Sequence, residues 1–130
     1  MNERRSFLKK LLALGALAAG GGVQAGPPAK ARPVVLCAPV RGHRYHDGPR
    51  VVHRLAPGDA LRLVREPENE HDDQAVAVHW NGAQLGYLPR EQNGVVATLL
   101  DQGVPLEAHL VKVDAAHAWE PCALEVRLAA

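Results

Sequence analysis

The sequence predicts a mainly β domain of α+β type: a small, partly closed antiparallel β-barrel of about six strands with one or two helices. Short apolar segments that alternate with polar residues recur along the chain. Asn81-Gly82 joins two of them and suits a tight hairpin turn, because both residues tolerate positive φ. Only one segment, 91–102, carries an apolar stripe at helical spacing. A chain of 130 residues is expected to form one small domain.

The strands are expected where apolar residues fall on one face. In segment 75–80, for example, Val76, Val78 and Trp80 share a face. Pro57-Gly58-Asp59 is typical of a turn, and the polar, breaker-rich segment 67–73 is typical of a loop. The expected strands are 34–38, a weak one at 51–55, and 60–64, 75–80, 83–88, 106–113 and 122–128.

The single predicted helix spans 91–102. Gly103 suits its C-terminal cap, because glycine adopts the left-handed conformation at that position without strain. Its apolar stripe is expected to consist of Val95, Val96, Leu99 and Leu100.

Residues 1–25 are interpreted as a secretory signal. A charged segment precedes an apolar stretch from Leu11 to about Ala19, which is too short to span a membrane. Val23-Gln24-Ala25 is a small-x-small cleavage site, so we expect cleavage before Gly26. The pair Arg4 and Arg5, followed by Ser-Phe-Leu-Lys, resembles a twin-arginine export signal. The alternatives are an ordinary Sec signal and a short uncleaved anchor.

This interpretation predicts an exported, periplasmic protein of a bacterium. Residues 26–33 are rich in proline and are expected to form an extended linker. The folded domain is then 34–130, with no stable membrane span, and we expect a monomer.

Charge is unevenly distributed along the chain. The formal net charge is +1, and residues 1–25 contribute +3 of it, so the mature chain carries about −2. Residues 26–65 hold eight Lys and Arg against two acids, whereas 66–130 hold three against eleven. The basic half could form an anion-binding face. Alternatively, folding interleaves the two halves and pairs their charges.

Several classes of site are disfavoured by residue content. Two cysteines exclude a disulfide-dense scaffold and a four-cysteine zinc site. His43 and His46 have His-x-x-His spacing, and His71-Asp72 could join them, but nothing fixes a complete ligand set, so we expect no metal and no cofactor.

Catalysis is not expected either. The only serine is Ser6, inside the signal, and the chain has no Gly-x-x-x-x-Gly-Lys loop. Cys37 and Cys122 lie in the first and last strands, where they could form a disulfide in an oxidising compartment or stay as buried free thiols.

Three segments, in order, resemble the HIRAN domain family. They are Val40-Arg-Gly-His-Arg-Tyr-His-Asp-Gly48, the segment 61–78 with its Glu66-Pro-Glu-Asn69 core, and Leu85-Gly-Tyr-Leu-Pro-Arg90. Together they cover about residues 36–113. The resemblance implies a small OB-like or SH3-like antiparallel barrel, and binding of single-stranded DNA at its 3′ end without catalysis.

The resemblance also implies roles for individual residues. Arg44 and Tyr45 match positions that contact phosphate and stack on bases, and Asp72 matches the aspartate that would accept a hydrogen bond from a free 3′-hydroxyl. The remaining implied nucleic-acid-binding positions are His46, Asn69, His71, Tyr87 and Arg90. His46 and His71 depart from the family, because aromatic rings are common at both places and histidine stacks more weakly.

Each role has a structural alternative. Asn69 and Asp72 could simply cap the turn before the strand at Ala75. Tyr45 could be half-buried core, and Arg44 and Arg90 could be solvated surface. Glu66-Pro67 could be a fold signature without any contact to a ligand.

Two functions remain open at this point. The first is a nucleic-acid-binding module that recognises single-stranded DNA or its 3′ end. The alternative is an exported envelope module that keeps the fold but binds a protein or another ligand, as the export signal and the net charge near −2 suggest.

Overall fold

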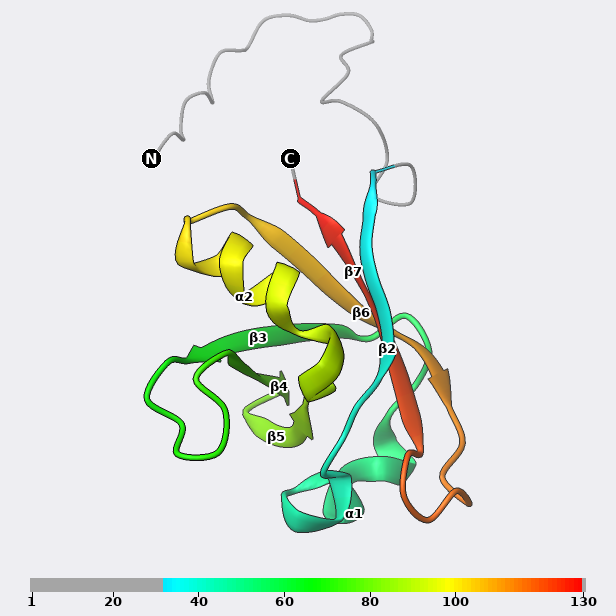
Figure 1. Cartoon of the computed structure of the whole chain (residues 1–130). Coiled ribbons are helices and arrows are strands. Elements are labelled where there is room, and N and C mark those ends of the chain that lie inside the picture. Colours follow the sequence, from blue (N-terminus) through cyan, green and yellow to red (C-terminus); the bar gives the residue numbers. More distant parts are fainter. Residues whose placement is uncertain (1–31, 130) are drawn as a thin grey trace, which may run out of the picture. The chain divides into compact units, whose positions relative to one another are not determined.

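The computed structural model of the chain describes residues 32–129, whose arrangement is shown in Figure 1. The strands are β2 (Val34–Pro39), β3 (Ala60–Glu66), β4 (Ala75–Trp80), β5 (Ala83–Tyr87), β6 (Leu106–Val113) and β7 (Cys122–Leu128). The α-helices are α1 (Gly48–Val51) and α2 (Gly94–Asp101), and single turns of 3-10 helix lie at His43–Tyr45, Val52–Arg54 and Arg90–Gln92. These six strands match the expected ones to within two residues at either end; β2 extends one residue and β3 two residues further than expected.

The described strands form one antiparallel sheet in the order β2-β7-β6-β3-β4-β5. The sheet curls, and its two ends meet through one bridge: Arg41, just after β2, pairs with Tyr87 at the end of β5. The two residues exchange backbone hydrogen bonds of 2.8 Å. The predicted fold class, a mainly β, OB-like and partly closed architecture, is therefore confirmed.

Gly86 makes this closure possible. A Cβ atom at Gly86 would lie only 2.2 Å from the carbonyl oxygen of Arg41, and its φ is +153°. Any other residue would push the backbone of Arg41 away from β5, because that oxygen belongs to the main chain and cannot turn aside. The position of Arg41 beside the site described below therefore depends on this glycine.

The β4–β5 hairpin turns at Asn81-Gly82, as predicted. Asn81 has φ +46° and Gly82 has φ +83°, the positive values that such a turn requires. Strand β4 is more deeply buried than its alternating pattern suggested, because Ala75 and Ala77 on its second face are also covered. Both strands of the hairpin thus contribute buried residues to the core.

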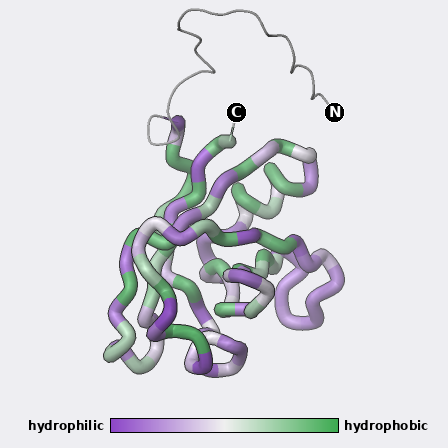
Figure 2. The backbone as a smooth tube through the Cα atoms, turned by 180° about the vertical axis from the view of Figure 1, so that it is seen from behind, coloured by the Kyte–Doolittle hydropathy of each residue, from purple (hydrophilic) through white to green (hydrophobic). Residues whose placement is uncertain are grey.

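The core lies inside the curl of the sheet. Its fully buried members include Val40, Val78, Leu85, Leu110 and Leu124, which come from both halves of the chain. Figure 2 shows strands along which hydrophobic and hydrophilic stretches alternate, whereas the loop between β3 and β4 is hydrophilic along most of its length. That loop therefore contributes little to the core and is free to border a ligand site.

Helix α2 is shorter than the predicted 91–102, because a separate 3-10 turn precedes it. Val96 is buried as expected, but Val95 is 62% exposed and Ala97 is buried in its place. The predicted C-terminal cap at Gly103 is confirmed: its N–H donates to Leu100 and that of Val104 donates to Leu99, the paired bonds of a Schellman motif.

The prediction of a weak strand at 51–55 was wrong. Residues 48–54 form α1 and a 3-10 turn instead. Pro49 stands in the first turn of α1, where its fixed φ favours a helix start and its missing N–H costs nothing. The β-branched pair Val51-Val52 had suggested a strand, but Val51 is fully buried as part of the helical segment.

The two cysteines are free thiols, so the disulfide alternative is not supported. In the β2–β7 register, Cys37 lies opposite Glu125, whereas Cys122 shares the core face with Leu124. Because neighbouring residues of a strand point to opposite faces, the two sulfur atoms lie on opposite sides of the sheet. The alternative expected two buried free thiols. Cys122 is buried as expected, but Cys37 is exposed.

The signal at 1–25, with Arg4 and Arg5, lies outside the described residues, as does most of the linker at 26–33. Within residues 32–129, the helices are too short or too polar to cross a membrane.

Candidate functional site

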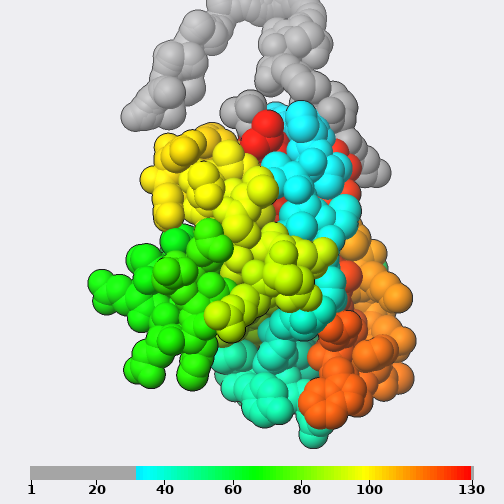
Figure 3. Space-filling model, in the orientation of Figure 1, coloured from blue at the N-terminus to red at the C-terminus, as the bar shows by residue number. Residues whose placement is uncertain are grey.

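A cleft of about 430 Å³ opens between the 42–46 segment, the 66–74 loop and the turn that leads into α2. Six of the eight residues implied by the family resemblance line it: His46, Asn69, His71, Asp72, Tyr87 and Arg90. On the face seen in Figure 3, the green loop, the yellow-green segment before α2 and the blue-green 42–46 segment lie beside one another. The fold therefore brings together residues that are up to 44 positions apart.

The other two predicted residues, Arg44 and Tyr45, line a neighbouring hollow of about 240 Å³. The guanidinium of Arg44 stacks on the ring of Trp119 at 4.4 Å, and Trp119 is 57% exposed. Tyr45 is 78% exposed, so it does not belong to the core. The hollow thus presents two flat rings and an arginine to solvent, next to the cleft.

The loop between β3 and β4 is held by its own polar groups. The side-chain oxygen of Asn69 accepts hydrogen bonds from the backbone N–H groups of His71 (2.8 Å) and Asp72 (3.2 Å). Its amide nitrogen donates to Glu66 at 3.1 Å. Asn69 therefore shapes the loop, as its structural alternative proposed, while its side chain also borders the cleft.

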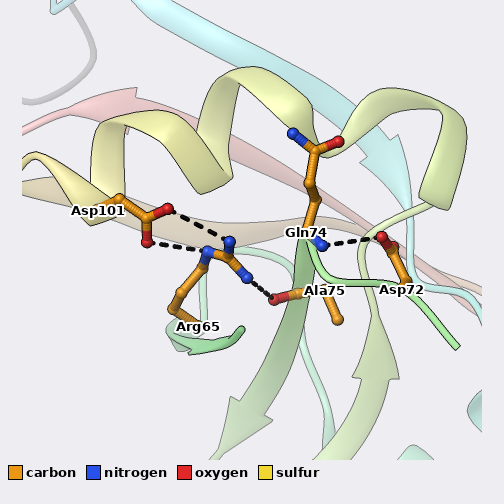
Figure 4. Close-up of polar contacts among 5 residues, drawn as sticks. All are labelled: Arg65, Asp72, Gln74, Ala75 and Asp101. Carbon is orange, nitrogen blue, oxygen red and sulfur yellow. Dashed lines mark hydrogen bonds and ion pairs between the residues drawn. The ribbon is translucent and has the colours of Figure 1, made fainter. Parts of the chain in front are cut away.

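Asp72, like Asn69, both stabilises the loop and borders the cleft. Its two carboxylate oxygens accept from the backbone N–H of Gln74 (2.9 Å) and from the side-chain amide of Asn93 (2.7 Å). Figure 4 shows the first of these bonds, together with the Arg65–Asp101 ion pair that ties the end of β3 to α2. The bond to Gln74 is the turn-capping role considered above. The carboxylate nevertheless lines the cleft, and each oxygen can accept more than one hydrogen bond.

Tyr87 lines the cleft and contacts residues on two of its sides. Its hydroxyl donates to Glu66 at 2.7 Å, and its ring meets that of His46 edge-on with centroids 5.4 Å apart. Partial burial, followed by the neighbouring Glu66 carboxylate, raises the pKa of the Tyr87 hydroxyl above 10.0. The hydroxyl is therefore a neutral, internally bonded group, and the ring is the part that can contact a ligand.

Arg41 lines the site, although the sequence analysis did not single it out. It borders both the cleft and the hollow. Its guanidinium pairs with Glu91 at 3.2 Å and with Glu120 at 2.6 Å. Trp119 was missed as well, because it lies in a loop outside the three motif segments, and its only signal was an isolated aromatic residue in a chain that is poor in them.

The two histidines with metal-ligand spacing point to different surroundings. His43 is 4% exposed and packs against Gly48, and its burial lowers its pKa below 6.5. His46 borders the cleft. Across residues 32–129, no three His, Cys, Asp or Glu side chains come together as a metal site.

Cys122 does not have the character of a nucleophile. Burial raises the pKa of its thiol to about 11, so the thiolate is scarce at neutral pH. The described site contains arginines, aromatic and imidazole rings, and carboxylates.

Comparison with known proteins identifies the family. A HIRAN domain model matches residues 35–130. The chain belongs to the HIRAN family, whose members are known as nucleic-acid-binding domains.

Solved structures agree with this assignment. The crystal structure of the HIRAN domain of human HLTF is 26% identical, with a TM-score of 0.59, and the match covers 72% of this chain and 76% of that one. A protein from Lactobacillus plantarum is 33% identical, with a TM-score of 0.62, and the match covers 75% of this chain and 97% of that one.

One curated relative is a Fanconi-associated nuclease 1 homolog from Oryza sativa subsp. japonica, which is 37% identical over 73 residues. The match covers 53% of this chain and only 7% of the length of that protein.

Proposed function

We propose that this HIRAN domain binds single-stranded DNA through the cleft and the adjoining hollow, and that it recognises a 3′ end. The observation that carries the proposal is the gathering of arginines and flat rings from distant segments on one face. Arg41, Arg44 and Arg90 supply the charge. The rings are those of Tyr45, His46, His71, Tyr87 and Trp119.

These groups suit a single strand better than a duplex. Unpaired bases can stack on exposed rings such as Tyr45 and Trp119, each stack contributing about 1–3 kcal/mol, while arginines contact the phosphates. Stacking does not depend on which base is present, so we expect little sequence preference. Histidine at positions 46 and 71 is expected to stack more weakly than tyrosine would.

Recognition of the 3′ end would depend on Asp72. Its carboxylate borders the cleft while both oxygens already accept protein hydrogen bonds, which fix its orientation. A free 3′-hydroxyl can donate one more hydrogen bond to it. A 3′-phosphate cannot donate in this way when ionised, and its charge would be repelled by the carboxylate.

Acidic residues limit the affinity. Glu66, Glu68, Glu70, Asp72 and Asp73 all lie in or beside the loop that borders the cleft. Their field opposes the approach of phosphate, so binding is expected to be weak at moderate salt and to rest on local contacts. Binding at low salt is therefore the condition in which the function shows itself first.

The test compares two labelled oligonucleotides that differ only in a 3′-hydroxyl or a 3′-phosphate, at low and moderate salt. We expect tighter binding of the hydroxyl form by the purified protein, and loss of that preference in Asp72→Asn. Arg90→Ala should weaken both forms alike. If the two oligonucleotides bind equally well, the protein does not recognise the 3′ end. If neither binds at low salt, the protein does not bind single-stranded DNA.

A protein ligand is the second candidate function, and the acidic loop is the observation that favours it. The exposed Tyr45 and Trp119 with Arg44 between them would also suit a peptide. Capture of an envelope protein by a domain that binds no oligonucleotide at low salt would favour this candidate.

We also propose export, through the twin-arginine-type segment at Arg4 and Arg5, with action in the periplasm. The test is fractionation of cells that express the chain, compared with an Arg4→Lys, Arg5→Lys variant. Retention of that variant in the cytoplasm, with the parent in the periplasm, is the expected result, and equal distribution of the two would contradict it.

A further inference from the structure

Arg41 has an unusual place in the site, because it separates the cleft from the hollow and borders both. Its backbone is fixed by the two hydrogen bonds to Tyr87, and the preceding Val40 is fully buried. Its side chain, by contrast, is 46% exposed. The main chain therefore presents a rigid base from which the guanidinium can reach either side.

Two carboxylates hold that guanidinium, and they come from separate segments. Glu91 belongs to the 3-10 turn before α2, and Glu120 to the loop between β6 and β7. The carboxylate side chains are 61% and 37% exposed. Such exposed ion pairs are weak, because water screens the charges and the long side chains lose freedom on pairing.

The same guanidinium is well suited to a phosphate. Its planar set of N–H donors matches carboxylate and phosphate oxygens alike, so the two kinds of anion compete for it. A nucleic-acid strand that passed from the cleft to the hollow would bring a phosphate next to Arg41, because Arg41 stands between them. Arg44 and Trp119 flank the same passage on the side of the hollow.

We propose that Arg41 is a phosphate-binding residue of this site, and that Glu91 and Glu120 compete with the bound strand for its guanidinium. A backbone phosphate replaces the carboxylates when nucleic acid binds, and the cleft and the hollow then act as one continuous groove. The inference rests on the proposed function, and it adds a contact together with two residues that lower the affinity.

The test measures the affinity of the full-length protein for a labelled oligothymidylate over a range of salt concentrations. In the Glu91→Gln, Glu120→Gln double variant, binding is expected to tighten about two- to five-fold, which matches the strength of exposed ion pairs. Its salt dependence should steepen, because in the parent protein the carboxylates released from Arg41 take up cations on binding, whereas the glutamines of the variant do not. Arg41→Ala is expected to weaken binding and to reduce the slope of log affinity against log salt by about one.

The control variant is Glu107→Gln, which removes one acid on β6, where its partner is Arg32 and not Arg41. If the double variant tightens binding only by changing net charge, Glu107→Gln will produce about half of its effect. In the Arg41→Ala background the double substitution should do no more than net charge predicts. Thermal unfolding midpoints close to that of the parent protein verify that each variant is folded.

The results distinguish a failure of the proposed function from a failure of the role proposed for Arg41. Absence of binding by the parent protein at low salt would overturn the proposed function. Binding by the parent that is indifferent to Arg41→Ala, or that weakens in the double variant, would overturn this inference and leave the proposed function standing. In that case, the ion pairs serve only to join the two segments that flank Arg41.

Discussion

The candidate site, which consists of the cleft and the adjoining hollow, has two walls that are stabilised in different ways. The loop wall, residues 66–74, satisfies its polar groups internally, through Asn69, Asp72 and the Glu66–Tyr87 bond. In the arginine wall, residues 41–46 with Trp119, the buried His43 lies beneath the exposed side chains of Arg41, Arg44 and Trp119, which are held by ion pairs and stacking. Substitutions in the two walls are therefore expected to have different consequences. A substitution in the loop wall is expected to change stability first, and one in the arginine wall binding first.

The largest effect is expected at Gly86, on which the position of the arginine wall depends. Gly86→Ala would drive a Cβ into the carbonyl oxygen of Arg41, 2.2 Å away, at a φ that L-residues rarely adopt. We expect a loss of about 3 kcal/mol in the free energy of unfolding, measured by urea denaturation.

The matched control is Gly82→Ala, since Gly82 also has positive φ but nothing within 4 Å of its Cβ position. It should lose only about 1 kcal/mol, the cost of the backbone conformation alone. Equal losses at the two glycines would show that the close approach to Arg41 does not matter.

A smaller loss of stability is expected from the loop wall. Asn69→Ala removes the acceptor of the His71 and Asp72 N–H groups and one of the two donors to the Glu66 carboxylate, which keeps its bond from Tyr87, at a cost of about 1–2 kcal/mol. Glu68→Ala, at an exposed position of the same loop, should change stability by less than about 0.5 kcal/mol. If both variants unfold alike, the loop wall is not held by Asn69.

The arginine wall should respond to pH through His43. Burial lowers the pKa of His43 below 6.5, so its neutral form is favoured in the folded protein. The stability that this group contributes is present above pH 6.5 and is lost as the pH falls below that value. In a urea series, His43→Leu should remove this part of the slope, whereas His53→Gln should retain it.

Asp47 provides an internal contrast for that experiment. Its pKa is lowered, mainly by the backbone N–H of Gln84, so its contribution is lost only below 3.8. The two groups therefore act in separate pH windows. A slope below pH 6.5 that persists in His43→Leu would assign the effect to other groups.

Much of the fold could be predicted because local signals agreed with the tertiary structure. Asn81-Gly82 set the β4–β5 turn, and Gly103 ended α2, since both need backbone angles that few other residues adopt. The error at 51–55 arose because Val51 and Val52 favour strands, while the buried packing of Val51 and the helix start at Pro49 decide for a helix. The prediction that Val95 belongs to the buried stripe was wrong for a related reason. The helix is short, and its Val96–Ala97 side packs against the core.

The site was predictable only in part. The second and third motif segments include parts of β3, β4 and β5, which are neighbours in the sheet, and the first is joined to the end of β5 by the Arg41–Tyr87 bridge. Most of their implied residues therefore meet at one cleft. Arg41 stood inside the first motif but gave no signal of its own, because its importance comes from two carboxylates that are 50 and 79 positions away. Such long-range pairings are set by the curl of the sheet and not by local sequence.

The most direct test of the central claim compares single-stranded DNA binding by Arg44→Ala and Arg62→Ala with that of the parent protein. Both variants lose one exposed arginine, but Arg44 lies in the arginine wall and Arg62 lies on β3 beside His79, outside the site. We predict that Arg44→Ala weakens binding about ten-fold at low salt, and that Arg62→Ala changes it by less than about two-fold. Equal weakening in the two variants would contradict the account, because binding would then follow net charge and not the site.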